Sequence, residues 1–328
     1  MSIHKLYPLK FKTIFKDKVW GGDRIKTLLG KDFSPLPNCG ETWELSGLKA
    51  NISVVNNGFL PGNELDELAE VYMADLVGEK IFEKYGINFP LLFKFIDTND
   101  YLSIQVHPDD NTAEKRHQSQ GKTEMWYVVH AEPDAEIITG FKKDTSKEEY
   151  LYHLENKTLK SILNIEKAEK GDVYYIPAGR VHAIGSGITL AEIQQASDIT
   201  YRIYDWDRPA SDGNMRKLHT DLALDVIDFK GYSQYKSLYR ENLNQSAELV
   251  KCPYFTTNLI KFDKNIECDY YFLDSFVVFM CIEGHFSIVW KDGQEVVNCG
   301  DTVLIPADIK NLKLMPSKPS KFLETYIV

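Results

Sequence analysis

The sequence has no Cys-x-x-Cys pair, although it contains five cysteines. Without that spacing a zinc ribbon is excluded, and the odd number of cysteines argues against a disulfide framework. Unpaired cysteines in such a chain behave as small hydrophobic residues. We therefore expect reduced and mostly buried thiols at Cys39, Cys252, Cys268, Cys281 and Cys299.

Long apolar runs and a surplus of positive charge are absent as well. No segment approaches the roughly 18 apolar residues of a transmembrane helix. Residues 1–12 lack the apolar core of a secretory signal peptide. With 38 Lys and Arg against 48 Asp and Glu, the net charge is −10, which is unfavourable for binding nucleic acid or a membrane surface. We expect a cytoplasmic protein with neither kind of partner.

What the chain does contain favours β structure. Hydrophobic residues make up 43% of its 328 residues, enough for ordinary cores, and its 18 Tyr and 17 Phe are typical of strands. A chain of this length suggests roughly two domains. Two segments, at about 64–85 and 146–163, instead have apolar residues at the three- and four-residue spacing of a helix.

Two strand patterns carry polar side chains that could lie close together. Residues 101–107 alternate, and Gln105 and His107 fall on the face opposite the apolar residues, so both side chains point into the same space. After a polar interval, Glu124 opens the run 124–129, which is apolar on both faces and therefore indicates a central strand. An amide, an imidazole and a carboxylate on neighbouring strands are metal-ligand types.

A third segment, 171–187, supplies one more group of this kind. Two Gly-containing turns flank a short strand there, and the second turn delivers His182. With His107 and Glu124, this residue completes a set of two histidines and one carboxylate. Such a set with an open coordination position suits a divalent metal that takes part in catalysis.

The motif Gly-Asp-x-x-x-Ile-Pro-Ala occurs at 171–178 and again at 300–307, which indicates two copies of one β fold. Short strands between Gly and Pro turns are typical of double-sheet jelly rolls of the cupin kind. In the second copy Asn311 stands where the first copy has His182. We therefore predict an all-β protein with two cupin-like jelly-roll barrels. They are a catalytic domain over 1–230, with helical insertions at about 64–85 and 146–163, and a degenerate, metal-free domain over 251–328.

Several blocks of the sequence resemble the signature blocks of type I mannose-6-phosphate isomerases in their short bacterial form. In chain order they are WGG at 20–22, GETWELSG at 40–47, QVHPDD, GKTEMWYVV, YIPAGRVHAI and SDITYRIYDWDR. They run from about Trp20 to Arg208, nearly two thirds of the chain.

This resemblance implies a reversible conversion of mannose 6-phosphate and fructose 6-phosphate by proton transfer through an enediol or enediolate. It also implies one zinc ion per chain. Carried over residue by residue, the implied metal ligands are Gln105, His107, Glu124 and His182. Gln is an unusual zinc ligand, so the sequence leaves open whether Gln105 binds the metal directly.

Cationic side chains lie close to these ligands in sequence. Alternation within 200–205 points Arg202 into the predicted barrel, where a buried arginine needs an anion. Arg suits bidentate recognition of phosphate, and Lys can lose its proton when desolvated. We expect Arg202 and Lys122 to be catalytic, Lys122 and Arg208 to bind substrate, and Glu192 to complete the family-like set as an acid or base. The base stays open among Lys122, Glu192 and a metal-bound water.

Two other classes of function remain as alternatives. Two histidines and a carboxylate also describe a cupin oxygenase that uses iron, but Gln105 and the phosphate-sized cluster of cations count against it. The second alternative is a non-catalytic sugar-binding barrel, and the intact set of metal ligands counts against this function. We expect a sugar phosphate as the small-molecule partner and either a monomer or a homodimer.

Other ionisable groups are predicted to have ordinary surface roles. Glu41 and Glu44 fall in a strand pattern and are candidate site residues, but a solvent-facing position on the strand is the stronger expectation. The histidines at 117, 130, 153 and 285 lie in polar stretches or at strand ends, where local hydrogen bonding is expected. The sequence does not decide the role of His219.

Overall fold

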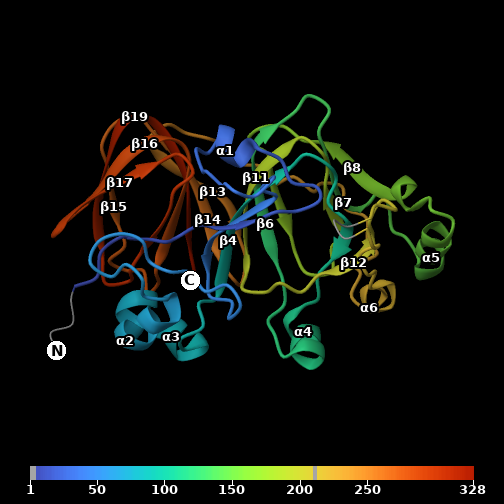
Figure 1. Cartoon of the computed structure of the whole chain (residues 1–328), viewed down its shortest axis with the longest axis horizontal. Helices are drawn as coiled ribbons and strands as arrows, with labels where there is room; N and C mark the ends of the chain where they lie inside the picture. Colours follow the sequence, from blue (N-terminus) through green and yellow to red (C-terminus); the bar gives the residue numbers. More distant parts are fainter. Residues whose placement is uncertain (1–4, 210–212) are drawn as a thin grey trace.

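The structure is a computed structural model that describes residues 5–209 and 213–328. Its strands form three antiparallel sheets of eight, six and five strands, and helices are few. In Figure 1 the C-terminal sheet, orange to red, lies on the left and the other two sheets lie on the right. The prediction of a β-rich chain is confirmed. The five cysteines are free, as expected, but only Cys39 and Cys281 are buried, and the other three are partly exposed.

The six-stranded and five-stranded sheets face each other across a shared core. The first contains, in spatial order, β2 (Ile14–Lys16), β3 (Glu41–Ser46), β4 (Leu91–Thr98), β11 (Ile188–Gln195), β6 (Glu124–Ala131) and β9 (Val173–Ile176). The second contains β12 (Tyr201–Tyr204), β5 (Ile104–Val106), β10 (His182–Ile184), β7 (Glu136–Phe141) and β8 (Leu163–Lys167). Trp126 and Leu190 from one sheet join Ile137 and Ile184 from the other in a single buried cluster. Apolar burial therefore holds the two sheets face to face.

The C-terminal sheet has eight strands. Its main path is β1 (Leu9–Lys10), β18 (Thr302–Ile305), β16 (Val277–Trp290), β19 (Asn311–Tyr326), β14 (Thr256–Phe262) and β13 (Gln245–Lys251), while β17 (Gly293–Asn298) pairs with β16 and β15 (Ile266–Asp269) with β19. The strand β1 belongs here because Leu9 pairs with Leu304. The outer face of the six-stranded sheet packs on this sheet, since Phe93 and Ile193 share one buried cluster with Val278.

The helices lie outside the sheets. They are α1 (Arg24–Thr27), α2 (Leu65–Val77), α3 (Glu79–Tyr85), α4 (Asp110–His117), α5 (Lys147–Glu155), the 3-10 turn η1 (Leu159–Ser161) and α6 (Thr220–Leu224). Figure 1 shows α2 and α3 below the C-terminal sheet and α5 at the opposite end of the molecule. Across the described residues, none of these helices has the length and apolar character needed to cross a bilayer.

The two helical segments of the sequence analysis form helices with different detail. The first is divided into α2 and α3 at Gly78, whose φ of +99° ends one helix and begins the next. In the second segment, at about 146–163, only α5 and η1 are helical. Its helix ends at Glu155 because Lys157 adopts a left-handed φ of +57°, and Leu163 already begins β8.

The two copies of the Gly-Asp-x-x-x-Ile-Pro-Ala motif have the same local structure. Each forms a turn followed by a strand, β9 in one copy and β18 in the other. In both turns the aspartate accepts a hydrogen bond from the backbone N–H three residues earlier, Asp172 at 2.8 Å and Asp301 at 2.9 Å. A lysine from a distant segment pairs with each carboxylate, Lys236 at 2.7 Å and Lys10 at 2.8 Å. The repeat in the sequence is therefore a repeat in structure.

Asp274 attaches the C-terminal sheet to α3. Its two carboxylate oxygens accept hydrogen bonds from the first backbone N–H groups of the helix, Glu79 at 2.7 Å and Lys80 at 3.2 Å. These N–H groups have no partner inside the helix, so the carboxylate satisfies them and also lies at the favourable end of the helix dipole.

We predict that Asp274→Ala lowers the free energy of unfolding by about 1 kcal/mol, the usual cost of a lost helix cap. Chemical denaturation followed by circular dichroism measures this change. Asp292→Ala serves as the control, because it removes an exposed ion pair with Lys5 and should change stability by less than about 0.5 kcal/mol. Equal effects of the two variants would contradict a capping role for Asp274.

Candidate metal centre and active-site cavity

Three predicted ligands meet between the two facing sheets. His107 follows β5 and His182 begins β10 in the five-stranded sheet, whereas Glu124 begins β6 in the six-stranded sheet. All three are buried, and their ligand atoms lie within 4.8 Å of one another. The Nε2 atoms of His107 and His182 lie 3.5 Å and 3.4 Å from the two carboxylate oxygens of Glu124.

Hydrogen bonds to the backbone fix the orientation of both imidazoles. Nδ1 of His107 lies 2.9 Å from the carbonyl oxygen of Ile199, and Nδ1 of His182 lies 2.8 Å from that of Arg180. A ring nitrogen that donates to a carbonyl leaves the other nitrogen, Nε2, as an acceptor aimed at the shared space. Burial lowers the pKa of His182 to about 3 and that of His107 well below its ordinary value. Both rings are therefore neutral, which is the state that binds metals.

The burial of the Glu124 carboxylate is only partly compensated, by a single neighbouring cation. The carboxylate is fully buried, and neither oxygen accepts a hydrogen bond of ordinary geometry, although Nζ of Lys122 lies 2.8 Å from one of them. Burial, followed by the negative charge of Glu192, raises the pKa of this carboxyl. A divalent cation would satisfy both orphaned oxygens, so this donor set fits a metal ion.

Gln105 lies next to the same centre. It pairs with His182 in the register of β5 and β10, and its side-chain amide nitrogen lies 3.2 Å from Nε2 of His182. The oxygen and nitrogen of an amide exchange places by a half-turn of the group, and this assignment rests on hydrogen-bond partners. With the oxygen turned inward, Gln105 would offer a fourth ligand atom.

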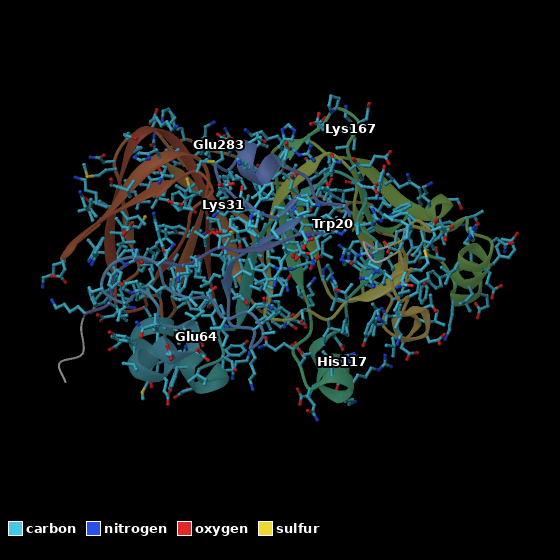
Figure 2. All side chains as sticks on the ribbon, viewed as in Figure 1. Trp20, Lys31, Glu64, His117, Lys167 and Glu283 are labelled. Atoms are coloured by element: carbon cyan, nitrogen blue, oxygen red, sulfur yellow. The ribbon has the colours of Figure 1, made fainter. Side chains whose placement is uncertain are left out.

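A cavity of about 390 Å³ opens beside these groups. Its wall includes Gln105, Lys122, His182, Glu192 and Arg202, all predicted from the sequence, and also Trp20, Glu41, Trp43, Lys94, Arg216 and His219. In Figure 2 Trp20 lies within the half of the molecule that contains the two facing sheets. The structure therefore gathers into one cavity the catalytic residues expected from the resemblance.

Buried charges alternate along the six-stranded side of the cavity. Lys94 lies between Glu192, at 3.0 Å, and Glu41, at 3.9 Å. Burial alone would raise the pKa of Glu192, but Lys94 and Lys122 lower it by more, so this carboxyl is ionised. The indole N–H of Trp126 donates to its other oxygen at 2.9 Å. Both Glu192 oxygens are therefore held in fixed positions facing the cavity.

Arg202 and Arg208 differ in their surroundings. Arg202 lines the cavity, donates from Nη1 to the carbonyl oxygen of Lys217 at 3.0 Å, and has a buried Nε without a hydrogen-bond partner. Burial and the nearby Arg216 lower its pKa. Arg208 does not line the cavity, and its guanidinium is 2.7 Å from Asp100. A direct contact of Arg208 with substrate stays a prediction, and it would require this ion pair to open.

The loop from β5 to β6 is fixed to both halves of the protein through Asp110. One carboxylate oxygen accepts from the Gly121 N–H at 2.8 Å and from the Gln195 side chain at 2.9 Å. The other accepts from the phenol of Tyr254, in the C-terminal part of the chain, at 2.8 Å. This loop carries Lys122, so the C-terminal part helps to position a cavity residue.

The sequence analysis missed several cavity residues. The prediction that Glu41 and Glu44 face solvent is wrong. Glu41 lines the cavity, and Glu44 is buried with Lys31 at 2.8 Å. Lys94 was not predicted, because it lies within an otherwise apolar strand. A lysine inside such a run nevertheless indicates a functional or paired position, because it can be buried only with a counter-charge. The undecided His219 also lines the cavity.

The remaining histidines have the local partners that were expected. His117 contacts the phenol of Tyr201 at 2.7 Å on α4, which lies at the lower edge of the molecule in Figure 2. His130, His153 and His285 bond with Glu132, Thr158 and Asn298, respectively. None of the four lines the cavity.

Comparisons with known proteins agree over almost the whole chain. A family model described as phosphomannose isomerase type I, catalytic domain, matches residues 8–141. The mannose-6-phosphate isomerase ManA of Bacillus subtilis is 34% identical over 313 residues, which cover 94% of this chain and 95% of the relative. The mannose-6-phosphate isomerase of Streptococcus mutans is 34% identical, with coverage of 93% and 94%. The crystal structure of the mannose 6-phosphate isomerase from Bacillus subtilis matches with a TM-score of 0.86 at 30% identity, covering 98% of this chain and 99% of that one. The chain therefore belongs to the type I phosphomannose isomerase family.

Proposed function

We propose that this protein interconverts mannose 6-phosphate and fructose 6-phosphate, with one zinc ion per chain held by His107, Glu124, His182 and Gln105. The observation that carries the proposal is the buried, unsatisfied Glu124 carboxylate between two neutral imidazoles, at the edge of a cavity that also contains Arg202 and Lys94. The names of the relatives agree with this reaction.

An aldose–ketose isomerisation by proton transfer moves a proton between two neighbouring carbons and builds negative charge on the two adjacent oxygens. When bound, a divalent metal supplies Lewis-acid stabilisation of that charge. We propose that Lys122 or Glu192 carries the proton transfer, because both side chains line the cavity beside the candidate ligands. Glu192 is ionised and so can accept a proton. Lys94 fixes the position of that carboxylate.

We propose that Arg202 stabilises the developing charge and that the cationic side of the cavity receives the phosphate. The buried Nε of Arg202 has no hydrogen-bond partner among the described residues, which leaves a donor available to a bound anion. Arg216 and His219 line the same side. Lys122 and Arg208 remain predicted substrate contacts.

We further propose that the two facing sheets form one cupin-like jelly-roll barrel within 1–230 and that residues 251–328 form a second, degenerate one. The matching motif copies at β9 and β18 support this division. This division needs one change near the N-terminus, because β1 lies within 1–230 but pairs with β18 in the C-terminal sheet. Cytoplasmic location, a monomeric or homodimeric state and the absence of nucleic-acid and membrane partners stay predictions.

A coupled assay with mannose 6-phosphate, run with and without a chelator, tests the proposed function. We expect turnover that the chelator removes and that added zinc restores. Oxygen consumption with ferrous iron in place of isomerisation would instead indicate an oxygenase. Sugar-phosphate binding without turnover would indicate a non-catalytic protein.

We predict that His182→Ala loses both zinc and activity while remaining folded, because the strands around it carry the core. Elemental analysis of the purified variant and circular dichroism measure the two properties. His130→Ala is the matched control, since that histidine bonds only with Glu132 near the surface and should keep both zinc and turnover. Full zinc occupancy in folded His182→Ala protein would remove His182 from the metal centre.

We predict that Arg202→Ala lowers kcat by about 10²–10³ with a much smaller rise in KM, as expected for a donor that acts mainly in the transition state. Arg202→Lys should recover little, because a point charge lacks the planar pair of donors. Steady-state kinetics on zinc-replete protein separates the two constants. A rise in KM alone, with kcat unchanged, would show that Arg202 only binds substrate.

A further inference from the structure

A second cavity, of about 530 Å³, lies in the C-terminal part of the chain. Strands β13, β14, β15 and β19 and the loop after β15 form its wall. The lining residues include Asn258, Ile260, Asp269, Tyr270, Glu324 and Tyr326. Neither the family resemblance nor the proposed reaction assigns a role to this cavity.

Strand pairing shows that this cavity lies between strands of the C-terminal sheet that are equivalent to the strands around the active-site cavity. In the first half Lys94 pairs with Glu192 between β4 and β11. In the C-terminal sheet Asn258 pairs with Glu324 between β14 and β19. A buried carboxylate on one strand thus faces a nitrogen donor on its neighbour in both places. The two motif copies support the same correspondence between the repeats, because β9 pairs with β6 and β18 pairs with β16.

A further strand pair extends the correspondence. His182 pairs with Gln105 between β10 and β5, and Asn311 pairs with Asp269 between β19 and β15, although of these last two only Asp269 lines the second cavity. Ile96 and Ile260 occupy matching positions two residues after Lys94 and Asn258, and each lines its own cavity. The two cavities are therefore related by the internal repeat and have four wall positions in common.

The groups for metal and phosphate are replaced in the second cavity. In the first copy the motif residue Ile176 pairs with Glu124, and in the second copy the equivalent Ile305 pairs with Val277. Val277 therefore takes the position of Glu124, and the second copy lacks the carboxylate ligand. Asn311 takes the place of His182. Among the described residues that line this cavity there is no Lys or Arg, whereas three carboxylates line it, from Glu267, Asp269 and Glu324. A phosphate group would meet only negative charge there.

One buried carboxylate is common to the two cavities, because Glu324 stands in register where Glu192 stands. The Glu324 side chain accepts hydrogen bonds from the phenol of Tyr270 at 2.5 Å and from the amide of Asn258 at 2.9 Å. Glu324 is only 6% exposed, and burial raises its pKa, although the two hydrogen bonds oppose this. A barrel that served only for support would gain stability from an apolar side chain here, because a buried carboxylate costs free energy. A buried carboxylate beside an open cavity is therefore an argument for a ligand.

We propose that the cavity in the C-terminal sheet binds an uncharged polyhydroxy molecule of the size of a free hexose. Hydroxyl groups both donate and accept, so they match the carboxylates, the Asn258 amide and the tyrosine hydroxyl groups in the wall. Tyr326 and Phe272 add aromatic faces for the apolar side of a sugar ring, and Phe272 is 97% exposed at the cavity. The active-site cavity takes the phosphorylated form and this one takes the form without phosphate.

Saturation-transfer NMR with D-mannose and D-fructose tests the proposal on the intact zinc-loaded protein. Mannose 6-phosphate at saturating concentration fills the active-site cavity, so the remaining signal reports the second one. Ser246→Trp is the test variant, because Ser246 is an exposed residue of β13 that lines the cavity, and an indole there fills it without disturbing the core. Lys313→Trp, exposed on β19 and outside this cavity, is the matched control.

We expect free-sugar binding in the millimolar range that persists under saturating mannose 6-phosphate. Ser246→Trp should weaken it by at least about tenfold, while Lys313→Trp leaves it unchanged and both variants keep isomerase turnover. No binding by the wild-type protein, a signal that mannose 6-phosphate abolishes, or equal binding by both variants would overturn the proposal.

Discussion

The Glu124 carboxylate is buried between two neutral imidazoles, and the arrangement of the catalytic half depends on that constraint. A buried carboxylate without partners costs several kcal/mol. In this protein Lys122 is the one cation in direct contact with it among the described residues, and neither oxygen accepts a proper hydrogen bond. A bound divalent cation removes that cost. The metal would therefore contribute to the stability of the site as well as to its chemistry.

The position of Glu124 also explains why two facing sheets are needed. Its strand belongs to one sheet and the histidines belong to the other, so the candidate metal cluster forms only when the two sheets pack together. The same packing buries Lys94 and Glu192, whose charges offset each other at 3.0 Å. The C-terminal part of the chain contributes through Tyr254, which holds Asp110 and thereby the loop that carries Lys122. The cavity therefore depends on contacts from both facing sheets and from the C-terminal part of the chain.

Local patterns were sufficient to predict the three residues of the candidate metal cluster, His107, Glu124 and His182. Alternation on one strand and a turn before another determine where His107 and His182 point, and both features are readable over a few residues. The direction in which the Lys94 and Glu41 side chains point could not be predicted in this way. It depends on which distant strands pair with the strands that carry them. The pairing of β1 with β18, which joins the chain's beginning to its C-terminal sheet, is equally non-local. The helix expected over 146–163 was shortened by the backbone at Lys157, which the apolar spacing does not report.

Anomalous diffraction at the zinc edge, from crystals of the zinc-loaded protein, tests directly whether Glu124 and the two histidines hold the metal. We expect one strong peak per chain at about 2.0–2.2 Å from Nε2 of His107, Nε2 of His182 and a carboxylate oxygen of Glu124. We expect no peak in the cavity of the C-terminal sheet. A zinc peak away from Glu124, or fully loaded protein in which no metal contacts the Glu124 oxygens, would contradict this metal centre.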